Sequence, residues 1–184
     1  MFRLLASTGL RVSELIALQW RHLSLDGSQP AVRVRRALVR GRVEPPKSRH
    51  GKREVPLDAP LVSELRERRR VAERGQDEDL VFPSLNGGSP LNPENLRRRV
   101  LRVAAEEADA PWAGFHTFRH TCAAILFERG LNVKQVQRWL GHHSPSFTLD
   151  TYVHLLEERL PEPIALSVEI GPARNVLSET VVAS

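Results

Sequence analysis

The 184-residue sequence has little of three things: cysteine, lysine and long apolar runs. Its one cysteine, Cys122, cannot form a disulfide within the chain, so the cysteine content does not point to an oxidising compartment. No apolar run is long enough to cross a bilayer, and the first residues lack the layout of a signal peptide. We therefore expect a cytoplasmic protein. Apolar residues make up 41% of the chain, which is enough for one domain with a real core.

The scarcity of lysine makes the charge of this chain unusual. Lysine and arginine together number 27 against 22 acidic residues, and only Lys47, Lys52 and Lys134 are lysines. A guanidinium can bind a phosphate through two parallel hydrogen bonds, although a bias toward arginine also follows from a GC-rich genome. Position is more telling, because nine basic residues and a single acid, Glu44, lie between Arg33 and Arg53. Such a block is a solvated surface or a contact for a polyanion, and its concentration favours nucleic acid.

Local patterns predict short strands first and helices afterwards. Residues 31–39, 42–45 and 53–57 are expected to form one small three-stranded antiparallel sheet, with an exposed basic loop before its last strand. Helices are expected over 12–18, from a cap at Asp58 to about 74, from 93 with Leu96, Val100 and Val103 on one face, over 117–128, and over 132–139. The fold class is therefore α+β and mostly helical. Prolines and polar residues from Pro161 onward predict a mobile tail.

Tyr152 is the only tyrosine in the sequence. Leu149, Tyr152, Val153 and Leu156 fall at positions i, i+3, i+4 and i+7, so they share one face of a helix. An aromatic residue on an apolar face is more often packing than chemistry. The position of Tyr152 alone therefore favours a core residue, and a role for its hydroxyl has to come from other parts of the chain.

Four short motifs place polar side chains at turns or helix starts. They are Thr-Gly-Leu-Arg-Val-Ser-Glu-Leu with Arg11, His-Thr-Phe-Arg-His-Thr with His116 and Arg119, Trp-Leu-Gly-His with His142, and Thr-Tyr-Val-His with Tyr152. A hairpin loop carrying Lys47 lies between the first two. In this order and at this spacing the motifs resemble the catalytic domain of the tyrosine recombinases, the phage integrase family. The resemblance covers about residues 1–158.

The resemblance implies an α+β catalytic domain over residues 1–160 and a tail over 161–184. Its expected function is cleavage and rejoining of DNA strands in site-specific recombination or integration. Arg11 and Arg119 match the phosphate-binding arginines, Lys47 the hairpin lysine, His116 the start of the His-x-x-Arg motif, His142 the histidine after Leu-Gly, and Tyr152 the nucleophile. Family members usually carry an N-terminal DNA-binding domain before this point, so we expect an N-terminally truncated catalytic domain. Double-stranded DNA and further copies assembled on it are the expected partners, with association to the nucleoid.

These residue types suit the chemistry on physical grounds. Two guanidinium forks stabilise the negative charge that gathers on the non-bridging oxygens of an attacked phosphodiester, and His142 can share that charge by hydrogen bonding. Tyrosine has an ordinary pKa near 10, so Tyr152 needs a base, and His116 is the candidate. Lys47 is the candidate acid for the leaving 5′-oxygen, with Lys52 as the alternative. Without a carboxylate cluster beside these residues, we expect neither a metal nor another cofactor.

Two other interpretations of the function fit parts of the sequence. The histidines His116, His120, His142 and His143 suggest a zinc site, but the His-Glu-x-x-His pattern is absent and one cysteine offers no thiolate set. Residues 117–140 suggest a helix-turn-helix, which would make the chain a DNA-binding regulator without catalysis. That hypothesis explains the charge but leaves Arg11, Lys47 and Tyr152 together unexplained.

Overall fold

The structure is a computed structural model that describes residues 1–46, 48–85 and 88–153. The tail predicted from Pro161 lies outside these residues. The helices are α1 (Phe2–Thr8), α2 (Val12–Leu15), α3 (Ala59–Arg70), α4 (Pro93–Leu96), α5 (Arg102–Glu107), α6 (Phe115–Glu128), α7 (Val133–Leu140) and α8 (Pro145–Tyr152). The short turns are the 3-10 helices η1 (Trp20–His22) and η2 (Arg49–Gly51) and the π-helical turn η3 (Arg97–Leu101). No helix in the described ranges combines the length and apolarity needed to span a membrane.

The strands form two small sheets instead of the single one predicted. One sheet has the antiparallel order β1 (Leu23–Ser24), β2 (Ala31–Val34) and β5 (Arg53–Pro56), and the other pairs β3 (Ala37–Val39) with β4 (Arg42–Glu44). The strand predicted over 31–39 is therefore divided. Its second part pairs with β4 because Arg40 and Gly41, both with positive φ, form a two-residue turn that joins Val39 directly to Arg42.

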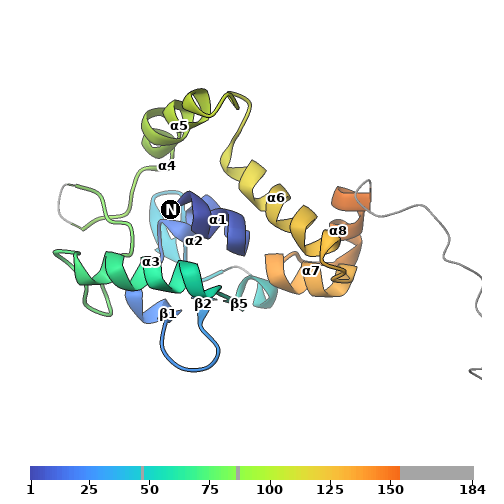
Figure 1. Ribbon diagram of the computed structural model, residues 1–184, viewed down its shortest axis with the longest axis horizontal. Coiled ribbons are helices and arrows are strands. Elements are labelled where there is room, and N and C mark those ends of the chain that lie inside the picture. Colours follow the sequence, from blue (N-terminus) through green and yellow to red (C-terminus); the bar gives the residue numbers. More distant parts are fainter. Residues whose placement is uncertain (47, 86–87, 154–184) are drawn as a thin grey trace, which may run out of the picture.

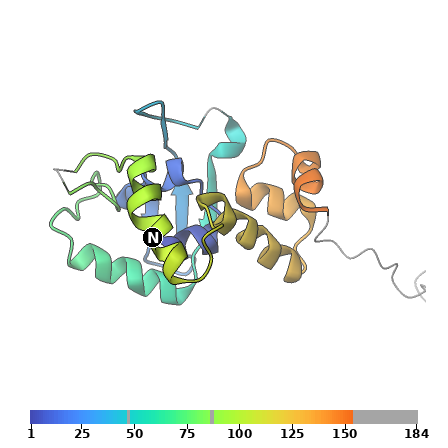
Figure 2. The ribbon, with the colours of Figure 1, turned by 90° about the horizontal axis from the view of Figure 1, so that it is seen from above.

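The apolar side chains form two separate clusters. The larger cluster gathers α1, α2, β2, β5 and α3 around residues such as Trp20 and Val32, and the smaller one joins α6, α7 and α8 around Leu126 and Leu140. Figures 1 and 2 show these groups of elements side by side, with α6–α8 at one end of the molecule. Trp139 is half-buried and packs against both clusters, so it lies where the two groups meet.

Two glycines allow the groups to approach closely. Gly9 ends α1 with a φ of 63°, and a Cβ atom there would lie 2.5 Å from the Cδ2 atom of Leu140 in α7. Gly141 ends α7 with a φ of 70°, and a Cβ atom there would lie 2.9 Å from the Cδ atom of Arg53 in β5. Both contacts are closer than side chains accept, and both backbones are left-handed, so only glycine fits either place.

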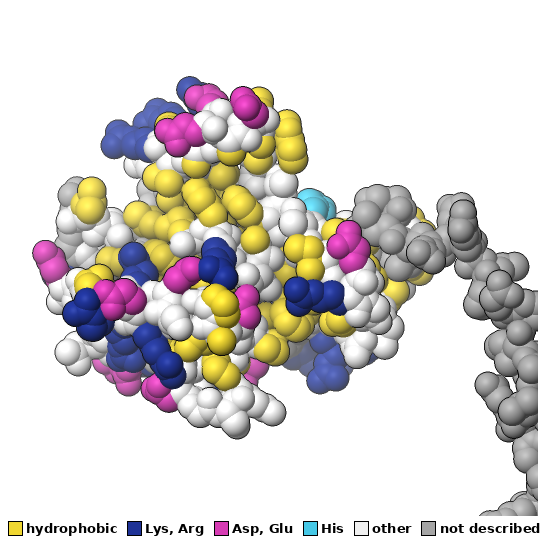
Figure 3. All heavy atoms as spheres, in the orientation of Figure 1, with side chains coloured by type: hydrophobic (Ala, Val, Ile, Leu, Met, Phe, Trp, Pro, Cys, Tyr) yellow, Lys and Arg dark blue, Asp and Glu magenta, His cyan; other side chains and the backbone are white. Residues whose placement is uncertain are grey.

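The helical segment that begins at Pro93 differs from its predicted pattern. Leu96 is buried as expected, but Val100 and Val103 are 45% and 47% exposed, and Leu101 is buried instead. The π-helical turn η3 is the physical reason, because its wider turn moves the buried face along by one residue after Leu96. On the face seen in Figure 3, hydrophobic side chains gather between this segment and α1.

The helix caps follow the sequence closely. Asp58 precedes α3 and its side chain accepts a hydrogen bond from the Leu61 amide at 2.8 Å. Asn132 precedes α7 and accepts one from the Gln135 amide at 3.0 Å, while the side-chain oxygen of Gln135 accepts one from the Asn132 amide at 2.8 Å. The predicted starts of both helices are confirmed. Because α7 is capped at one end and stopped by Gly141 at the other, the position of the next residue, His142, is well defined.

Candidate active site

Arg119 lies in α6 and links the two groups of elements. Only 5% exposed, its guanidinium donates one hydrogen bond to the carbonyl oxygen of Gly9 at 2.5 Å and another to that of Leu140 at 2.8 Å. Burial, together with the positive charges of Arg11 and Arg53, lowers its pKa to about 10. Arg119 therefore keeps its charge at neutral pH, with no carboxylate bonded to it among the described residues.

Arg11 stands at the start of α2 and is more open than Arg119. Its backbone amide donates to the carboxylate of Glu14 at 2.9 Å, and its Nη1 lies 3.2 Å from the other oxygen of that carboxylate. The side chain is still 41% exposed. Glu14 thus supports Arg11, as the sequence indicated, and the remaining guanidinium donors of Arg11 face solvent, where a phosphate oxygen could reach them.

The sequence did not single out Arg53, which was counted among the nine basic residues of a surface or polyanion contact. Arg53 is buried, and its guanidinium binds both oxygens of Glu14 at 3.0 Å while its Nε donates to the Trp139 carbonyl at 2.8 Å. The strand alternation could have found it, because Arg53 and Val55 face inward in β5 while Glu54 faces out.

The carboxylate of Glu14 is the shared partner of these two arginines. Burial alone would raise its pKa, but the hydrogen bonds and charge of Arg53, joined by those of Arg11, hold the pKa below its ordinary value. Glu14 is therefore ionised at neutral pH. It fixes Arg11 on one side and Arg53 on the other, and so ties α2 to β5.

His142 follows the end of α7 and is held by its own backbone. Its amide donates to the carbonyl of Gln137 at 3.1 Å, and its carbonyl accepts from the Gln137 side chain at 2.6 Å. The ring Nδ1 lies 2.8 Å from the hydroxyl oxygen of Thr148. Burial, together with the charges of Arg119, Arg11, Arg53 and His143, lowers the pKa of His142 to about 3, so the ring is neutral at pH 7.

Tyr152 ends α8 with its ring 2% exposed. The rings of His120, Phe127 and His142 have their centroids 5.4, 6.1 and 6.2 Å from it. Burial raises the pKa of Tyr152, and the charge of Arg119 opposes that rise. The resting hydroxyl is therefore protonated, and its loss of a proton is assisted by the same guanidinium that is proposed to bind the phosphate.

The apolar face predicted for the helix of Tyr152 is not a buried face. Leu149 and Val153 are 39% and 55% exposed, and Leu156 lies outside the described residues. Thr148, one turn before Tyr152, is fully buried. Tyr152 packs against α6 and the segment after α7, so its burial comes from tertiary contacts and not from the stripe seen in the sequence.

The other candidate residues are less closely associated with Tyr152. His116 is exposed on α6, one turn before Arg119, and the histidine rings in contact with Tyr152 within the described residues are His120 and His142. Lys47 lies outside the described residues, whereas its rival Lys52 is described and exposed. The structure thus brings together Arg11, Arg119, His142 and Tyr152 and adds Arg53. The catalytic roles of these residues, and those of His116 and Lys47, stay predictions.

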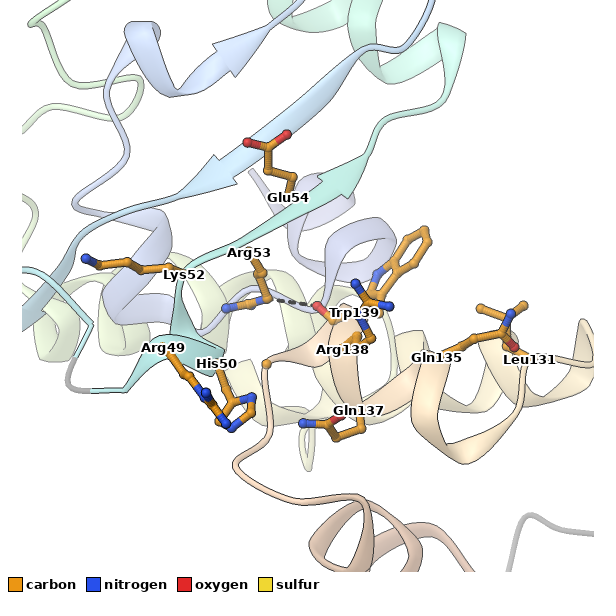
Figure 4. Close-up of a pocket in the computed structure, with 11 residues that line it drawn as sticks. Arg49, His50, Lys52, Arg53, Glu54, Leu131, Gln135, Gln137, Arg138 and Trp139 are labelled. Atoms are coloured by element: carbon orange, nitrogen blue, oxygen red, sulfur yellow. Dashed lines mark hydrogen bonds between the residues drawn. The ribbon is translucent and has the colours of Figure 1, made fainter.

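A basic cavity of about 610 Å³ opens beside this group, between η2, β5 and α7. Figure 4 shows Arg49, His50, Lys52 and Arg138 along its wall, with Arg53 bonded to Trp139 at its base. Its lining offers several cations, which suits a polyanion. In the described ranges no three His, Cys, Asp or Glu side chains gather to hold a metal ion, so the histidines of the zinc hypothesis form no such group there.

The chain belongs to the phage integrase family, whose sequence pattern matches residues 1–159. It is 33% identical over 163 residues to the tyrosine recombinase XerD of Rhizobium meliloti, covering 87% of this chain and 48% of that protein. It is 29% identical over 185 residues to a XerC-like tyrosine recombinase of Caldanaerobacter subterraneus subsp. tengcongensis, covering 86% of this chain and 46% of that one. The chain therefore spans about half the length of these relatives.

A comparison of structures supports the same fold. The integrase of the transposon Tn1549, solved in complex with transposon right end DNA, aligns with 82% of this chain and 52% of its own chain, at a TM-score of 0.65 and 24% identity. At that identity the likeness concerns the fold alone. The fold class predicted from the sequence, α+β with mostly helical structure, is confirmed, although the small sheet is built from different strands.

Proposed function

We propose that this chain is the catalytic domain, over residues 1–160, of a tyrosine recombinase that cleaves and rejoins DNA strands through a 3′-phosphotyrosyl intermediate. The observation that carries the proposal is the convergence of Arg11, Arg119, His142 and Tyr152 from four separate segments. Double-stranded DNA is the proposed substrate, and further copies of the chain assembled on it are the proposed partners. The proposal concerns this domain and not a whole recombinase, because the chain covers about half the length of these relatives.

In the proposed first step the hydroxyl oxygen of Tyr152 attacks the phosphorus of one phosphodiester. The hydroxyl proton passes to a base, which the motif order assigns to His116. Arg11 and Arg119 hold the two non-bridging oxygens, and His142 adds a hydrogen bond to them. Because Arg119 is buried and already oriented by two carbonyls, it needs little rearrangement to stabilise the charge that develops.

The bond between phosphorus and the 5′-oxygen then breaks, and that oxygen takes a proton from Lys47. The product is a 3′-phosphotyrosyl link and a free 5′-hydroxyl. A 5′-hydroxyl of another strand can attack the link and give its proton to Lys47, while the oxygen of Tyr152 leaves and takes its proton back from His116, so no nucleotide hydrolysis is needed. Lys47 becomes dispensable when the 5′-oxygen is replaced by sulfur, because a thiolate leaves without protonation.

The test is covalent trapping on a nicked duplex. We expect the 184-residue chain to form an SDS-resistant DNA adduct that Tyr152→Phe abolishes. DNA binding by the variant should stay close to that of the parent, since the ring remains. An adduct formed by the phenylalanine variant would contradict the proposal.

Two assignments need variants of their own. His116→Ala and His120→Ala distinguish the proposed base from the histidine ring nearest to Tyr152. A variant without its base depends on the ionised form of tyrosine, so its slowed cleavage should recover as the pH rises toward about 10. Lys47→Ala and Lys52→Ala, each compared on normal and 5′-thio DNA, identify the acid as the lysine whose variant is rescued by sulfur. The helix-turn-helix alternative is not favoured, because the family match and the similar proteins are integrases and recombinases, and a regulator without catalysis would form no adduct in this test.

A further inference from the structure

Thr148 faces His142 from α8 and has no role in the proposed reaction so far. Its side chain is fully buried, His142 is 4% exposed, and the hydroxyl oxygen of Thr148 lies 2.8 Å from Nδ1 of the imidazole. The same hydroxyl lies 3.4 Å from the carbonyl oxygen of Ser144. A hydroxyl has one proton to donate, so it can donate to only one of these two acceptors at a time.

The choice matters because the ring of His142 is neutral. Its pKa is lowered to about 3, by burial first and then by the charges of Arg119, Arg11, Arg53 and His143. A neutral imidazole carries one proton, so one nitrogen donates and the other accepts. Among the described residues, Nδ1 is bonded to Thr148, and Nε2 has no hydrogen-bond partner. Nε2 is therefore the nitrogen left for a ligand.

Two arrangements are possible on this geometry. If Thr148 donates to Ser144, then Nδ1 carries the proton and Nε2 is a bare acceptor, which would repel a phosphate oxygen. If Thr148 donates to Nδ1, then Nε2 carries the proton and can donate to that oxygen. The 2.8 Å contact is within the usual range of a strong bond, whereas 3.4 Å is at its limit. The 2.8 Å contact fits either direction of donation, but the bond that Thr148 would donate to Ser144 is long, and this favours donation to His142.

We propose that Thr148 is a positioning residue: its hydroxyl donates to Nδ1 of His142, fixes the tautomer with the proton on Nε2, and so makes His142 a hydrogen-bond donor to the phosphate. The ring is held from other sides as well. Phe147 meets it edge-on with centroids 4.9 Å apart, and the ring of Tyr152 is nearly parallel to it at 6.2 Å. Within the described ranges, the contact with Thr148 is thus the hydrogen bond that decides which nitrogen is protonated. The proposal rests on the proposed function for the identity of the ligand.

The neighbouring threonine in α8 provides a matched control. Thr151 donates its hydroxyl to the carbonyl of Phe147 at 2.7 Å, the ordinary bond of a helical threonine to the preceding turn. Thr151→Val removes a hydroxyl from the same helix without touching His142. An effect that both Thr148→Val and Thr151→Val show comes from losing a hydroxyl in α8. An effect that only Thr148→Val shows comes from losing the contact with the imidazole of His142.

The first experiment needs no DNA. Nitrogen-15 spectra of the histidine rings in the 184-residue chain at pH 7, with His142→Asn used to assign the signal, report which nitrogen carries the proton. We expect the Nε2–H tautomer for His142 in the parent and in Thr148→Ser, and loss of that preference in Thr148→Val. A proton on Nδ1 in the parent, or on both nitrogens, would overturn the proposal. The spectrum of the parent decides this even if the valine variant does not fold.

The second experiment measures the trapping rate. We expect Thr148→Val to lower it about tenfold, the effect of one lost hydrogen bond, while Thr148→Ser and Thr151→Val stay close to the parent. In a His142→Ala background the valine substitution should have no further effect, because Thr148 then has no ring to orient. An equal loss in both backgrounds would overturn the proposal. A chain with the expected tautomer that forms no adduct would instead count against the proposed function alone.

Discussion

The sheet half of the molecule, α1 to α3 with the strands β1 to β5, differs sharply from the helical half, α6 to α8. In the described part of the chain the main apolar cluster of the sheet half contains seventeen buried residues, and that of the helical half contains six. The candidate active site is not contained in either cluster, although Tyr152 is itself a member of the smaller one. Arg11 comes from the sheet half, and Arg119, His142 and Tyr152 come from the helical half, so the site exists only while the two halves are docked.

The halves are joined by polar side chains as much as by apolar ones. Arg53 reaches from β5 to the carbonyl of Trp139, and Arg119 reaches from α6 to the carbonyl of Gly9. Each buried cation thus stabilises an interface and also contributes to the positive field of the site. The contacts that dock the halves therefore share residues with the candidate site, and the smaller half should be the first to open.

The largest effect is expected from breaking the pair that joins the halves. Arg53→Met leaves the carboxylate of Glu14 buried with only Arg11 beside it, and we expect a loss of about 3–5 kcal/mol in the free energy of unfolding. Urea unfolding measures it. Arg33→Met is the matched control, because Arg33 pairs with Glu54 on the exposed face of the same sheet and should cost about 1 kcal/mol or less. Equal losses in the two variants would contradict a special role for the buried pair.

A second prediction separates the stabilities of the halves. Leu15→Ala and Leu140→Ala each create a cavity at a fully buried site and should each cost about 2–5 kcal/mol. Hydrogen exchange should show that Leu140→Ala loosens α6 to α8 while β2 and β5 keep most of their protection. Leu15→Ala should lower protection throughout the described chain. Uniform loss in both variants would mean that the two halves unfold as one unit.

Many helix ends in both halves could be predicted from the sequence, because their signals are local. Asn132 and Gly141 mark the two ends of α7, and the start of α3 follows from Asp58. The division of the strands was missed, since the turn at Arg40 and Gly41 redirects pairing in a way that alternation does not reveal. The π-helical turn in η3 was also missed, because it shifts a periodic pattern by one residue without any special composition.

The sequence predicted the motif residues of the candidate site but not the residues that hold them in place. Arg11, Arg119, His142 and Tyr152 were found through ordered short motifs, and the structure brings them together. Arg53 and Thr148 were not found: strand alternation can mark Arg53 as inward-facing but does not name Glu14 as its partner, and a threonine in a helix looks ordinary. Their importance lies in contacts with Glu14 and His142, 39 and 6 residues away, which no local pattern encodes.

Acid is expected to lower the free energy of unfolding by a smaller amount, through one histidine in each half. Burial and neighbouring arginines lower the pKa of His22 to about 4, and the pKa of His142 is about 3. Below about pH 6.5 the two histidine rings therefore bind protons in the unfolded chain but stay neutral in the folded chain. Stability consequently falls as the pH drops from about 6.5 toward 4. Between pH 7 and pH 5 we expect a loss of roughly 1–2 kcal/mol for each histidine.

Urea unfolding at the two pH values tests this prediction, and single variants assign it. His22→Asn in the sheet half and His142→Asn in the helical half should each make stability less sensitive to pH. A variant that loses as much stability as the parent between pH 7 and pH 5 would show that its histidine is not kept neutral by the fold. If acid acts first on the smaller half, trapping activity should decline before the sheet half loses its protection from hydrogen exchange.

The smallest change in stability is expected at the residue with the largest proposed role in chemistry. Tyr152→Phe removes one oxygen and keeps a ring that is 2% exposed and packed among His120, Phe127 and His142. We expect its free energy of unfolding to stay within about 1 kcal/mol of the parent, the range of one net hydrogen bond. Tyr152→Ala, which empties the same space, should cost about 3–5 kcal/mol.

The pair of variants separates packing from chemistry in the helical half: loss of the covalent adduct in the stable phenylalanine variant would then be due to the hydroxyl. A phenylalanine variant as unstable as the alanine one would mean that the hydroxyl holds the fold, and that its missing adduct reflects an open interface between the halves.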